Sequence, residues 1–335
     1  MWMVTLNILY QSDNNFSKHM GVSIISLLEN NRAAEDIHVI IIDDGISVNV
    51  KNDIRNIVEN YGRRIQWIDA NAIRKDTIAS DWPIYEGFRT NTNCYLKYFI
   101  FDGMLDESIE RVMYIDSDSI VLGPLDDLFT LDMQDKAIGM TRCCLVTESY
   151  LKVTGVGTDD LYFNAGMNLF DAKKWRERQY PEKLIDGASK WTFSTTIDQD
   201  LLNFVVRGDV IDLGCQYNYQ STHMAFPHQT YLKYYRPFRF YSQEEADAAM
   251  NDPRILHLLR FLGERPWNKN SIHPSTEVYC RYLDMTPWKD EEKPPVKNDR
   301  LVFKIERLVY RILPRSVFLR LFKRFHNKTT IKSVK

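Results

Sequence analysis

The sequence predicts an α/β protein built on a mostly parallel, doubly wound sheet, and two observations support this prediction. Along roughly the first 140 residues, short apolar segments rich in β-branched residues alternate with segments of helical periodicity. The chain has 335 residues, of which 44% are hydrophobic, so it can bury a large core. This alternation is typical of βαβ units whose helices cover both faces of a parallel sheet.

The elements expected in this first part follow in chain order. Strands are expected over residues 4–10, 37–42, 65–68, 111–115 and 137–140, and helices over residues 20–29, 53–61 and 95–104. After about residue 140 the pattern becomes less regular, but two further helices are expected over residues 243–250 and 276–283, the first with Ser242 as its N-cap. We therefore expect one domain over residues 1–285, with halves at about 1–140 and 141–285.

The C-terminal part differs in composition from the rest of the chain. Residues 286–300 are charged and interrupted by proline, which predicts a linker. Residues 301–335 carry ten Lys and Arg against one acid, a charge of +9, which leaves about −11 on the rest of a chain with net charge −2. Apolar residues recur there at helical spacing on both sides of Pro314, which predicts two basic amphipathic helices suited to an anionic membrane surface. The alternative is that their apolar faces pack on the rest of the chain.

Composition also narrows the class of protein. The small net charge gives no reason to expect a nucleic-acid partner. The five cysteines are scattered without a Cys-x-x-Cys pair, which predicts neither a disulfide framework nor a zinc site. The N-terminus has no basic segment followed by a long apolar run, so we expect a cytoplasmic protein and not a secreted one. The sequence does not indicate the oligomeric state.

The strand expected over residues 111–115 ends in Asp116-Ser-Asp118. Ligands of open α/β sheets bind at the carboxyl ends of strands, and alternate residues of an extended chain point the same way. The two carboxylates can therefore share one cation, and hard ions such as Mg²⁺ and Mn²⁺ commonly complete their coordination with substrate phosphates. The alternative is an ordinary turn in which the carboxylates cap nearby backbone N–H groups.

Five further segments favour the cation site over the ordinary turn. They are Gln11-Ser-Asp13-Asn-Asn15-Phe, Tyr95-Leu-Lys97-Tyr-Phe-Ile, Tyr162-Phe-Asn164-Ala-Gly166-Met-Asn-Leu-Phe-Asp171, Asp198-Gln199-Asp200-Leu-Leu-Asn203, and His257 with Gly263-Glu-Arg265-Pro-Trp267. Over roughly residues 4–267 the chain resembles glycosyltransferase family 8, which includes bacterial lipopolysaccharide-type galactosyl- and glucosyltransferases and glycogenin-like enzymes. The resemblance implies a GT-A fold, a UDP-sugar donor and transfer with retention of configuration.

The resemblance also implies roles for particular residues. Asp116, Asp118 and His257 are expected to hold Mn²⁺ or Mg²⁺, and Gly263 and Arg265 to bind the diphosphate. Asp13 and Asn15 are expected to bind the uridine. Lys97 and Asn164 are expected to bind the nucleotide sugar. Asp198 and Gln199 are expected to lie beside the transferring sugar, at the reacting centre. Because Gln199 is a poor nucleophile, we expect attack of the acceptor on the face that UDP leaves, with covalent catalysis by Asp198 as the alternative.

Three positions depart from the family pattern. Lys97 stands where the family usually has Arg, Arg142-Cys143-Cys144 stands where it usually has an Asp, and His257 lies farther from Gly263 than usual. A lysine keeps the charge but cannot form a bidentate contact.

We expect transfer of galactose or glucose from UDP-galactose or UDP-glucose to a lipid-linked precursor of a capsule, lipopolysaccharide or glycolipid. The enzyme would then work at the inner face of the cytoplasmic membrane. The alternatives are a glycogenin-like self-glucosylating enzyme and a catalytically silent module that binds sugar nucleotides or glycans.

Overall fold

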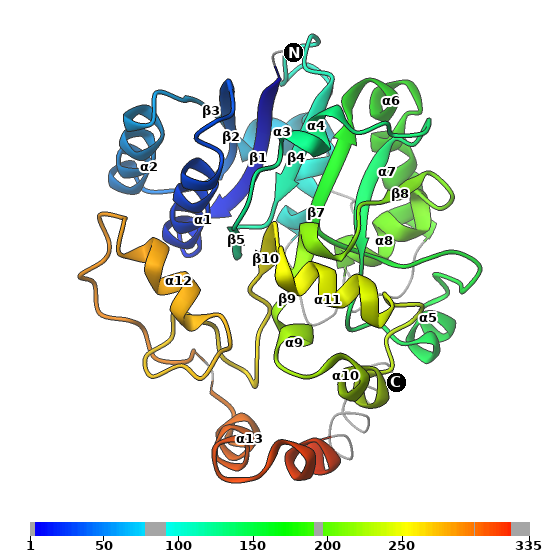
Figure 1. Cartoon of the computed structure of the whole chain (residues 1–335). Coiled ribbons are helices and arrows are strands. Elements are labelled where there is room, and N and C mark those ends of the chain that lie inside the picture. The colour runs from blue at the N-terminus through cyan, green and yellow to red at the C-terminus, as the bar shows by residue number, and fades with distance from the viewer. Residues whose placement is uncertain (1–3, 78–91, 191–196, 298, 323–335) are drawn as a thin grey trace.

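The computed structural model describes residues 4–77, 92–190, 197–297 and 299–322 of the chain. A twisted central sheet runs through the molecule with helices on both faces, and a small second sheet lies beside its carboxyl edge (Figure 1). The predicted α/β class with a mostly parallel sheet is confirmed.

The strands of the central sheet are not arranged in chain order. Among the described residues the order is β3 (Arg64–Asp69), β2 (Asp36–Asp44), β1 (Thr5–Asp13), β4 (Arg111–Ile115), β7 (Phe163–Asp171), β6 (Ile138–Arg142) and β8 (Val210–Asp212). All neighbours pair in parallel except β7, which is antiparallel to both β4 and β6. Each of the five expected strands lies largely or wholly within one of these.

Both faces of this sheet are buried, which explains the continuous apolar runs in the sequence. Along β4, Met113 and Ile115 belong to one core, while Val112 and Tyr114 belong to the core on the opposite face. Successive side chains of a strand point to opposite faces, so a strand covered on both sides must be apolar throughout.

Helices supply the two covering layers. Those packed on the first core include α1 (Ser17–Asn30), α2 (Val48–Asn60) and α12 (Thr276–Leu283), and those on the second include α6 (Ala172–Glu177), α7 (Tyr180–Lys190) and α8 (Ile197–Val205). The remaining helices are α3 (Ala70–Thr77), α4 (Asp126–Thr130), α5 (Glu148–Thr154), α9 (Ser221–Met224), α10 (His228–Tyr235), α11 (Gln243–Asn251), α13 (Leu301–Ile312) and the 3₁₀ helices η1 (Thr92–Tyr98) and η2 (Cys215–Asn218).

Two expectations for helices have different outcomes. Helix α11 begins after Ser242, whose side chain forms a reciprocal capping box with Glu245, as the N-cap prediction required. The helix expected over residues 95–104 is instead the 3₁₀ helix η1 followed by turns. Its residues 95–101 are all buried, so the segment has no solvent-exposed face and lacks the amphipathic pattern of a regular surface helix.

The small second sheet was not expected from the sequence. It consists of β5 (Ser119–Val121), β10 (Ile255–His257) and β9 (Tyr219–Gln220), with β10 in the middle. Strand β5 follows β4 after a break of three residues, and β10 pairs with it in antiparallel fashion. The second sheet therefore joins the end of β4 to a segment nearly 140 residues later in the chain.

Residues 286–300, which we expected to form a linker, lie against the domain at several points. Trp288 is 4% exposed, and its indole N–H donates to Asp53 at 3.2 Å. Farther on, the N–H of Lys269 donates to the carbonyl of Pro294 at 2.9 Å.

After this segment, α13 and the helical residues 315–322 lie on either side of Pro314, as expected for two helices. The end of the expected tail, residues 323–335, lies outside the described residues. None of the helices in the described part of the chain is both long and apolar enough to cross a bilayer.

The packing of Trp288 on α1 generates a stability prediction. A Cβ at Gly21 would lie 2.3 Å from the Trp288 ring, so Gly21→Ala must displace that ring. Although alanine favours a helix by about 1 kcal/mol over glycine, overpacking should lower the free energy of unfolding by about 1–3 kcal/mol. Denaturant unfolding measures this change.

Trp288→Leu is the matched background for this test. With the ring removed, the same Gly21→Ala change should become neutral or stabilising, because only the helix preference remains. An equal loss of stability in both backgrounds would contradict the packing of Trp288 against Gly21.

Candidate active site

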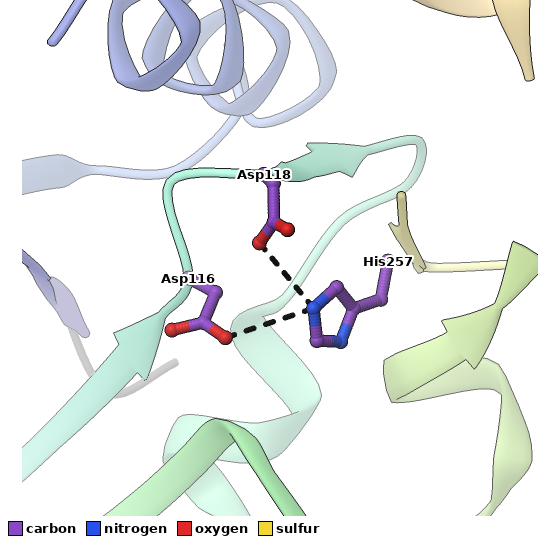
Figure 2. Close-up of side chains that lie close together, drawn as sticks. All are labelled: Asp116, Asp118 and His257. Carbon is purple, nitrogen blue, oxygen red and sulfur yellow. Dashed lines mark ion pairs between the residues drawn. The ribbon is translucent and has the colours of Figure 1, made fainter. Parts of the chain in front are cut away.

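Two carboxylates and one imidazole converge at the carboxyl end of β4 (Figure 2). Asp116 follows β4, Asp118 precedes β5, and His257 is the last residue of β10. The Nε2 atom of His257 lies 3.6 Å from Oδ2 of Asp116 and 3.3 Å from Oδ1 of Asp118. One ligand atom from each residue can be chosen so that all lie within 4.8 Å of one another.

Backbone hydrogen bonds hold this geometry. The N–H of Asp116 donates to the carbonyl of Gly166 at 2.8 Å, and the N–H of Leu258 donates to the carbonyl of Asp118 at 2.8 Å. Gly166 is required because a Cβ there would lie 2.3 Å from the His257 ring and 2.7 Å from Asp116. The three side chains can approach only because this position has no side chain.

The long separation between His257 and Gly263 is accommodated by a tight turn. Phe261 and Glu264 pair as an isolated bridge, and both Leu262 and Gly263 between them have positive φ, 48° and 81°. The extra residues are therefore placed in the turn after β10, and His257 remains beside the two carboxylates.

Gly263 itself contacts helix α13. A Cβ at this position would lie 2.5 Å from the ring of Phe303 on α13. The ring can pack there only because glycine has no side chain. The loop expected to bind the diphosphate is thus also a packing surface for α13.

The two carboxylates differ in their surroundings. Burial would raise the pKa of Asp118, but the guanidinium of Arg265 at 2.5 Å and the neighbouring His257 hold its pKa well below the ordinary value. Burial raises the pKa of Asp116, and the Asp118 charge adds to this although Lys97 opposes it. Tyr114 also donates to Oδ1 of Asp116 at 2.6 Å and orients that carboxylate.

Lys97 and Asp198 form a buried ion pair on the other side of Asp116. The ammonium lies 2.9 Å from Oδ2 of Asp198, donates to the carbonyl of Ala165 at 3.2 Å and stacks 4.3 Å above the Tyr114 ring. Burial would lower the pKa of Lys97, but Asp198, Tyr114 and Asp116 raise it above the ordinary value. Lys97 therefore keeps its charge and orients Asp198.

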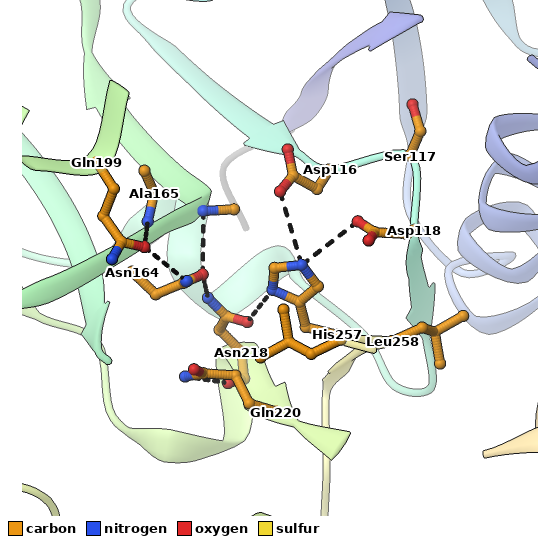
Figure 3. A network of polar contacts seen from close by, with 12 residues as sticks. Asp116, Ser117, Asp118, Asn164, Ala165, Gln199, Asn218, Gln220, His257 and Leu258 are labelled. Carbon is orange, nitrogen blue, oxygen red and sulfur yellow. Dashed lines mark hydrogen bonds and ion pairs between the residues drawn. The ribbon is translucent and has the colours of Figure 1, made fainter. Parts of the chain in front are cut away.

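Gln199 and Asn164 lie together in a chain of amide groups. Oε1 of Gln199 accepts from Nδ2 of Asn164 at 2.8 Å and from the N–H of Ala165 at 3.2 Å, and its Nε2 donates to Sγ of Cys143 at 3.7 Å. The chain continues from Asn164 to Asn218 and His257 (Figure 3). Asn218 was missed from the sequence, where it lies in no recognisable motif.

The first loop is held by turn hydrogen bonds. Oδ1 of Asp13 accepts from the N–H of Phe16, and Oδ2 accepts from Nδ2 of Asn15, both at 3.0 Å. The aromatic part of the same loop reaches the segment that carries Arg265, because Phe16 meets the Trp267 ring edge-on at 6.0 Å between centroids. The segments of residues 11–16 and 263–267 therefore lie side by side.

The three convergent groups fit a divalent cation. Two carboxylate oxygens and one imidazole nitrogen are ligands that Mn²⁺ and Mg²⁺ accept, and three protein ligands leave positions for phosphate oxygens. Nδ1 of His257 lies 3.1 Å from Oδ1 of Asn218, so the ring is held with Nε2 toward the carboxylates. The three groups therefore have the chemistry to hold a divalent cation.

The fold is of the GT-A glycosyltransferase type. A model of glycosyl transferase family 8 matches residues 7–271, and the chain belongs to that family. As a member of this family, the chain is a glycosyltransferase.

Known proteins resemble most of this chain. General stress protein A of Bacillus subtilis (strain 168) is 27% identical over 296 residues, which cover 88% of this chain and 98% of that protein. The lipopolysaccharide 1,2-glucosyltransferase of Escherichia coli (strain K12) is 24% identical over 88% of this chain and 82% of its own length. The structure of the galactosyltransferase LgtC with donor and acceptor sugar analogues superimposes with a TM-score of 0.62 at 18% identity, over 84% of this chain and 96% of LgtC, a likeness that shows the fold.

The place of His257 beside the two carboxylates generates a prediction about metal affinity. His257→Ala should weaken Mn²⁺ binding at least about tenfold, because losing a ligand should weaken binding no less than losing a group that orients one. Titration of the protein with Mn²⁺, with free Mn²⁺ followed by electron paramagnetic resonance, measures the dissociation constant.

The matched control is His38→Ala on β2, which removes another buried histidine. An unshifted Mn²⁺ titration for His257→Ala would remove His257 from the ligand set.

Proposed function

We propose that this protein transfers a hexose, galactose or glucose, from its UDP-sugar to a cell-surface glycan precursor, with retention of configuration and with Mn²⁺ or Mg²⁺ as cofactor. The observation that carries the proposal is the convergence of Asp116, Asp118 and His257 within 4.8 Å at the carboxyl end of β4. We assign the catalytic domain to residues 1–285, with residues 286–300 as its connection to the basic tail 301–335.

Negative charge develops on the departing diphosphate during glycosyl transfer. A divalent ion held by Asp116, Asp118 and His257 would supply Lewis-acid stabilisation of that charge. Arg265, which lies 2.5 Å from Asp118, is placed to add a second positive charge at the same point, with Gly263 beside it in the loop. Charged groups fixed in advance in a buried site are usually the largest contribution to catalysis.

The sugar side of the site is built from Lys97, Asn164, Asp198 and Gln199. We propose that Asn164 and Gln199 line the sugar subsite, because neighbouring donors and acceptors hold their amides in fixed orientations. Asp198, paired with Lys97, stabilises the positive charge that develops on the sugar ring. The hydrogen bonds of Gln199 and the ion pair of Asp198 with Lys97 both favour attack of the acceptor on the face that UDP leaves, because these two side chains are already engaged.

We assign Asp13 and Asn15 to the uridine end of the donor, since the 11–16 loop lies beside the 263–267 segment. Cys143, in the segment where the family pattern usually has an Asp, accepts a hydrogen bond from Nε2 of Gln199 at 3.7 Å. A cysteine is a much weaker hydrogen-bonding group for a sugar hydroxyl, so discrimination between glucose and galactose must rest on other groups.

The convergence of Asp116, Asp118 and His257 favours an enzyme over a catalytically silent binding module. The basic tail favours a lipid-linked acceptor over a glycogenin-like self-glucosylating reaction. The glucosyltransferase of E. coli named for lipopolysaccharide supports the same class of acceptor by analogy. We therefore propose that the enzyme works at the inner face of the cytoplasmic membrane.

Helix α13 carries the argument for membrane contact because its two sides differ. Phe303, Arg307 and Tyr310 face the domain: Phe303 packs on Gly263, Arg307 donates to the carbonyl of Leu262 at 2.9 Å, and the Tyr310 ring lies 5.2 Å from Phe261. The opposite side carries the exposed apolar residues, which are Leu301 (71%), Ile305 (52%), Leu308 (57%) and Ile312 (68%). Residues spaced in this way share one side of a helix.

The charge of the tail supports a lipid surface as the partner of this exposed apolar side. A helix with exposed apolar residues on one side, in a segment whose sequence carries a net charge of +9, fits an anionic lipid surface. The alternative interpretation was that the apolar faces of the tail pack on the rest of the chain. It also holds in part, because one side of α13 packs on the domain.

Asp118→Ala should abolish Mn²⁺-dependent release of UDP from UDP-glucose and UDP-galactose, because the metal loses a ligand that keeps its negative charge at neutral pH. A coupled assay for UDP measures the release, and circular dichroism verifies the fold. Asp126→Ala, at an exposed aspartate on α4, is the matched control and should retain full activity. Unchanged UDP release by Asp118→Ala would rule out the proposed metal site.

Replacing Leu301, Ile305, Leu308 and Ile312 together by serine should strongly reduce co-sedimentation of the full chain with phosphatidylglycerol vesicles. The loss follows because burial of apolar area and attraction of the cations act together. A control at another exposed apolar residue, Ile185→Ser on α7, should bind as the wild type does. Equal binding by the fourfold variant and the wild type would refute a membrane role for α13.

A further inference from the structure

The metal-ligand candidate His257 is connected to the proposed sugar-binding residues by a chain of buried amides. Asn218, which is 1% exposed on η2, lies between the two groups (Figure 3). Its Nδ2 lies 2.8 Å from Oδ1 of Asn164, and its Oδ1 lies 3.1 Å from Nδ1 of His257.

Backbone donors fix the direction of every hydrogen bond in this chain. The N–H of Ala165 can only donate, so the Gln199 atom 3.2 Å away must be the carbonyl oxygen, and Asn164 must therefore direct its NH₂ group to it. The N–H of Gly166 likewise requires an oxygen of Asn164 at 3.0 Å. Each amide then has only one orientation that satisfies all of its neighbours.

The same logic extends to His257. Because Oδ1 of Asn164 is an acceptor, Asn218 must direct its NH₂ group to Asn164 and its carbonyl oxygen to His257. A carbonyl oxygen can only accept, so Nδ1 of His257 must carry a proton. In the neutral ring, Nε2 then presents its lone pair toward Asp116 and Asp118.

We propose that Asn218 is a positioning residue that fixes the tautomer of His257 and thereby prepares Nε2 as a metal ligand. This inference rests on the proposed function, since it presupposes a divalent ion at Asp116 and Asp118. The competing tautomer carries its proton on Nε2, 3.3 Å from Oδ1 of Asp118, where it would donate to that carboxylate. Such a hydrogen bond would have to break before a metal could bind.

A second consequence follows from the position of Asn218 between two binding groups. Its NH₂ group holds Asn164, and Asn164 in turn holds Gln199, so one side chain orients both the metal side and the sugar side. The two functions of Asn218 use different atoms, Oδ1 for His257 and Nδ2 for Asn164. Substitutions can therefore separate them.

Asn218→Leu removes both hydrogen bonds, and Asn218→Asp removes only the donor while keeping an acceptor for Nδ1 of His257. We expect Asn218→Leu to weaken Mn²⁺ binding by about 10–100-fold, the usual effect of losing a group that orients a ligand. Asn218→Asp should keep Mn²⁺ affinity close to that of the wild type. Its KM for the UDP-sugar should nevertheless rise, because a carboxylate cannot donate to Oδ1 of Asn164.

The Mn²⁺ dissociation constant is measured without UDP-sugar, by electron paramagnetic resonance of the free ion, and the KM in a UDP-release assay. Asn31→Leu is the matched control, since Asn31 is another buried asparagine, just after α1, whose Nδ2 donates to the carbonyl of Leu27 and whose Oδ1 accepts from the N–H of Leu125. It should bind Mn²⁺ as the wild type does.

The outcomes separate this inference from the proposed function. If the wild type itself binds no Mn²⁺, the metal site is wrong. If the wild type binds Mn²⁺ and both Asn218 variants bind it equally well, the positioning role is wrong. Should Asn218→Leu fail to fold, Asn218→Asp alone decides, because loss of Mn²⁺ affinity in that variant would contradict the proposal.

Discussion

The register between β5 and β10 is the constraint on which the candidate site depends. His257 pairs with Ser119, directly after Asp118, and the N–H of Leu258 donates to the carbonyl of Asp118. Since successive residues of a strand point to opposite faces, a slip of one residue would turn the imidazole away from both carboxylates. The pairing within the small sheet therefore determines that His257 lies beside Asp116 and Asp118.

Bringing two carboxylates together in a buried place is unfavourable unless positive charge compensates them. Arg265 pairs with Asp118, while Lys97 lies near Asp116 and is itself paired with Asp198. The result is an alternation of charges across the site, in which the metal would add the positive charge that the two carboxylates still need. The diphosphate would then meet a region prepared for negative charge.

The sequence was sufficient for the alternating core and the end of β4, because apolar periodicity and Asp-x-Asp are local patterns. It could not predict the small sheet, since three-residue strands are too short for a periodic signal and their pairing joins segments far apart in the chain. For the same reason Asn218 was missed, because its importance comes only from its contacts with Asn164 and His257. The separation of His257 from Gly263 looked unusual in the sequence, but the turn at Leu262 accommodates it. The segment 95–101 was expected to be a regular helix but begins in a 3₁₀ helix. Because all of its residues are buried, the sequence has no apolar–polar pattern that could distinguish the two kinds of helix.

The central claim is that Asp116, Asp118 and His257 hold a divalent ion that binds the diphosphate of a UDP-sugar. Electron–nuclear double resonance of Mn²⁺ bound to the protein with UDP tests it most directly. We expect ³¹P couplings from directly bound phosphates and one nitrogen coupling that changes when histidine is labelled with ¹⁵N and disappears in His257→Ala. A spectrum in which Mn²⁺ has UDP but no histidine nitrogen, or in which the protein leaves the spectrum of Mn²⁺ with UDP unchanged, would contradict it.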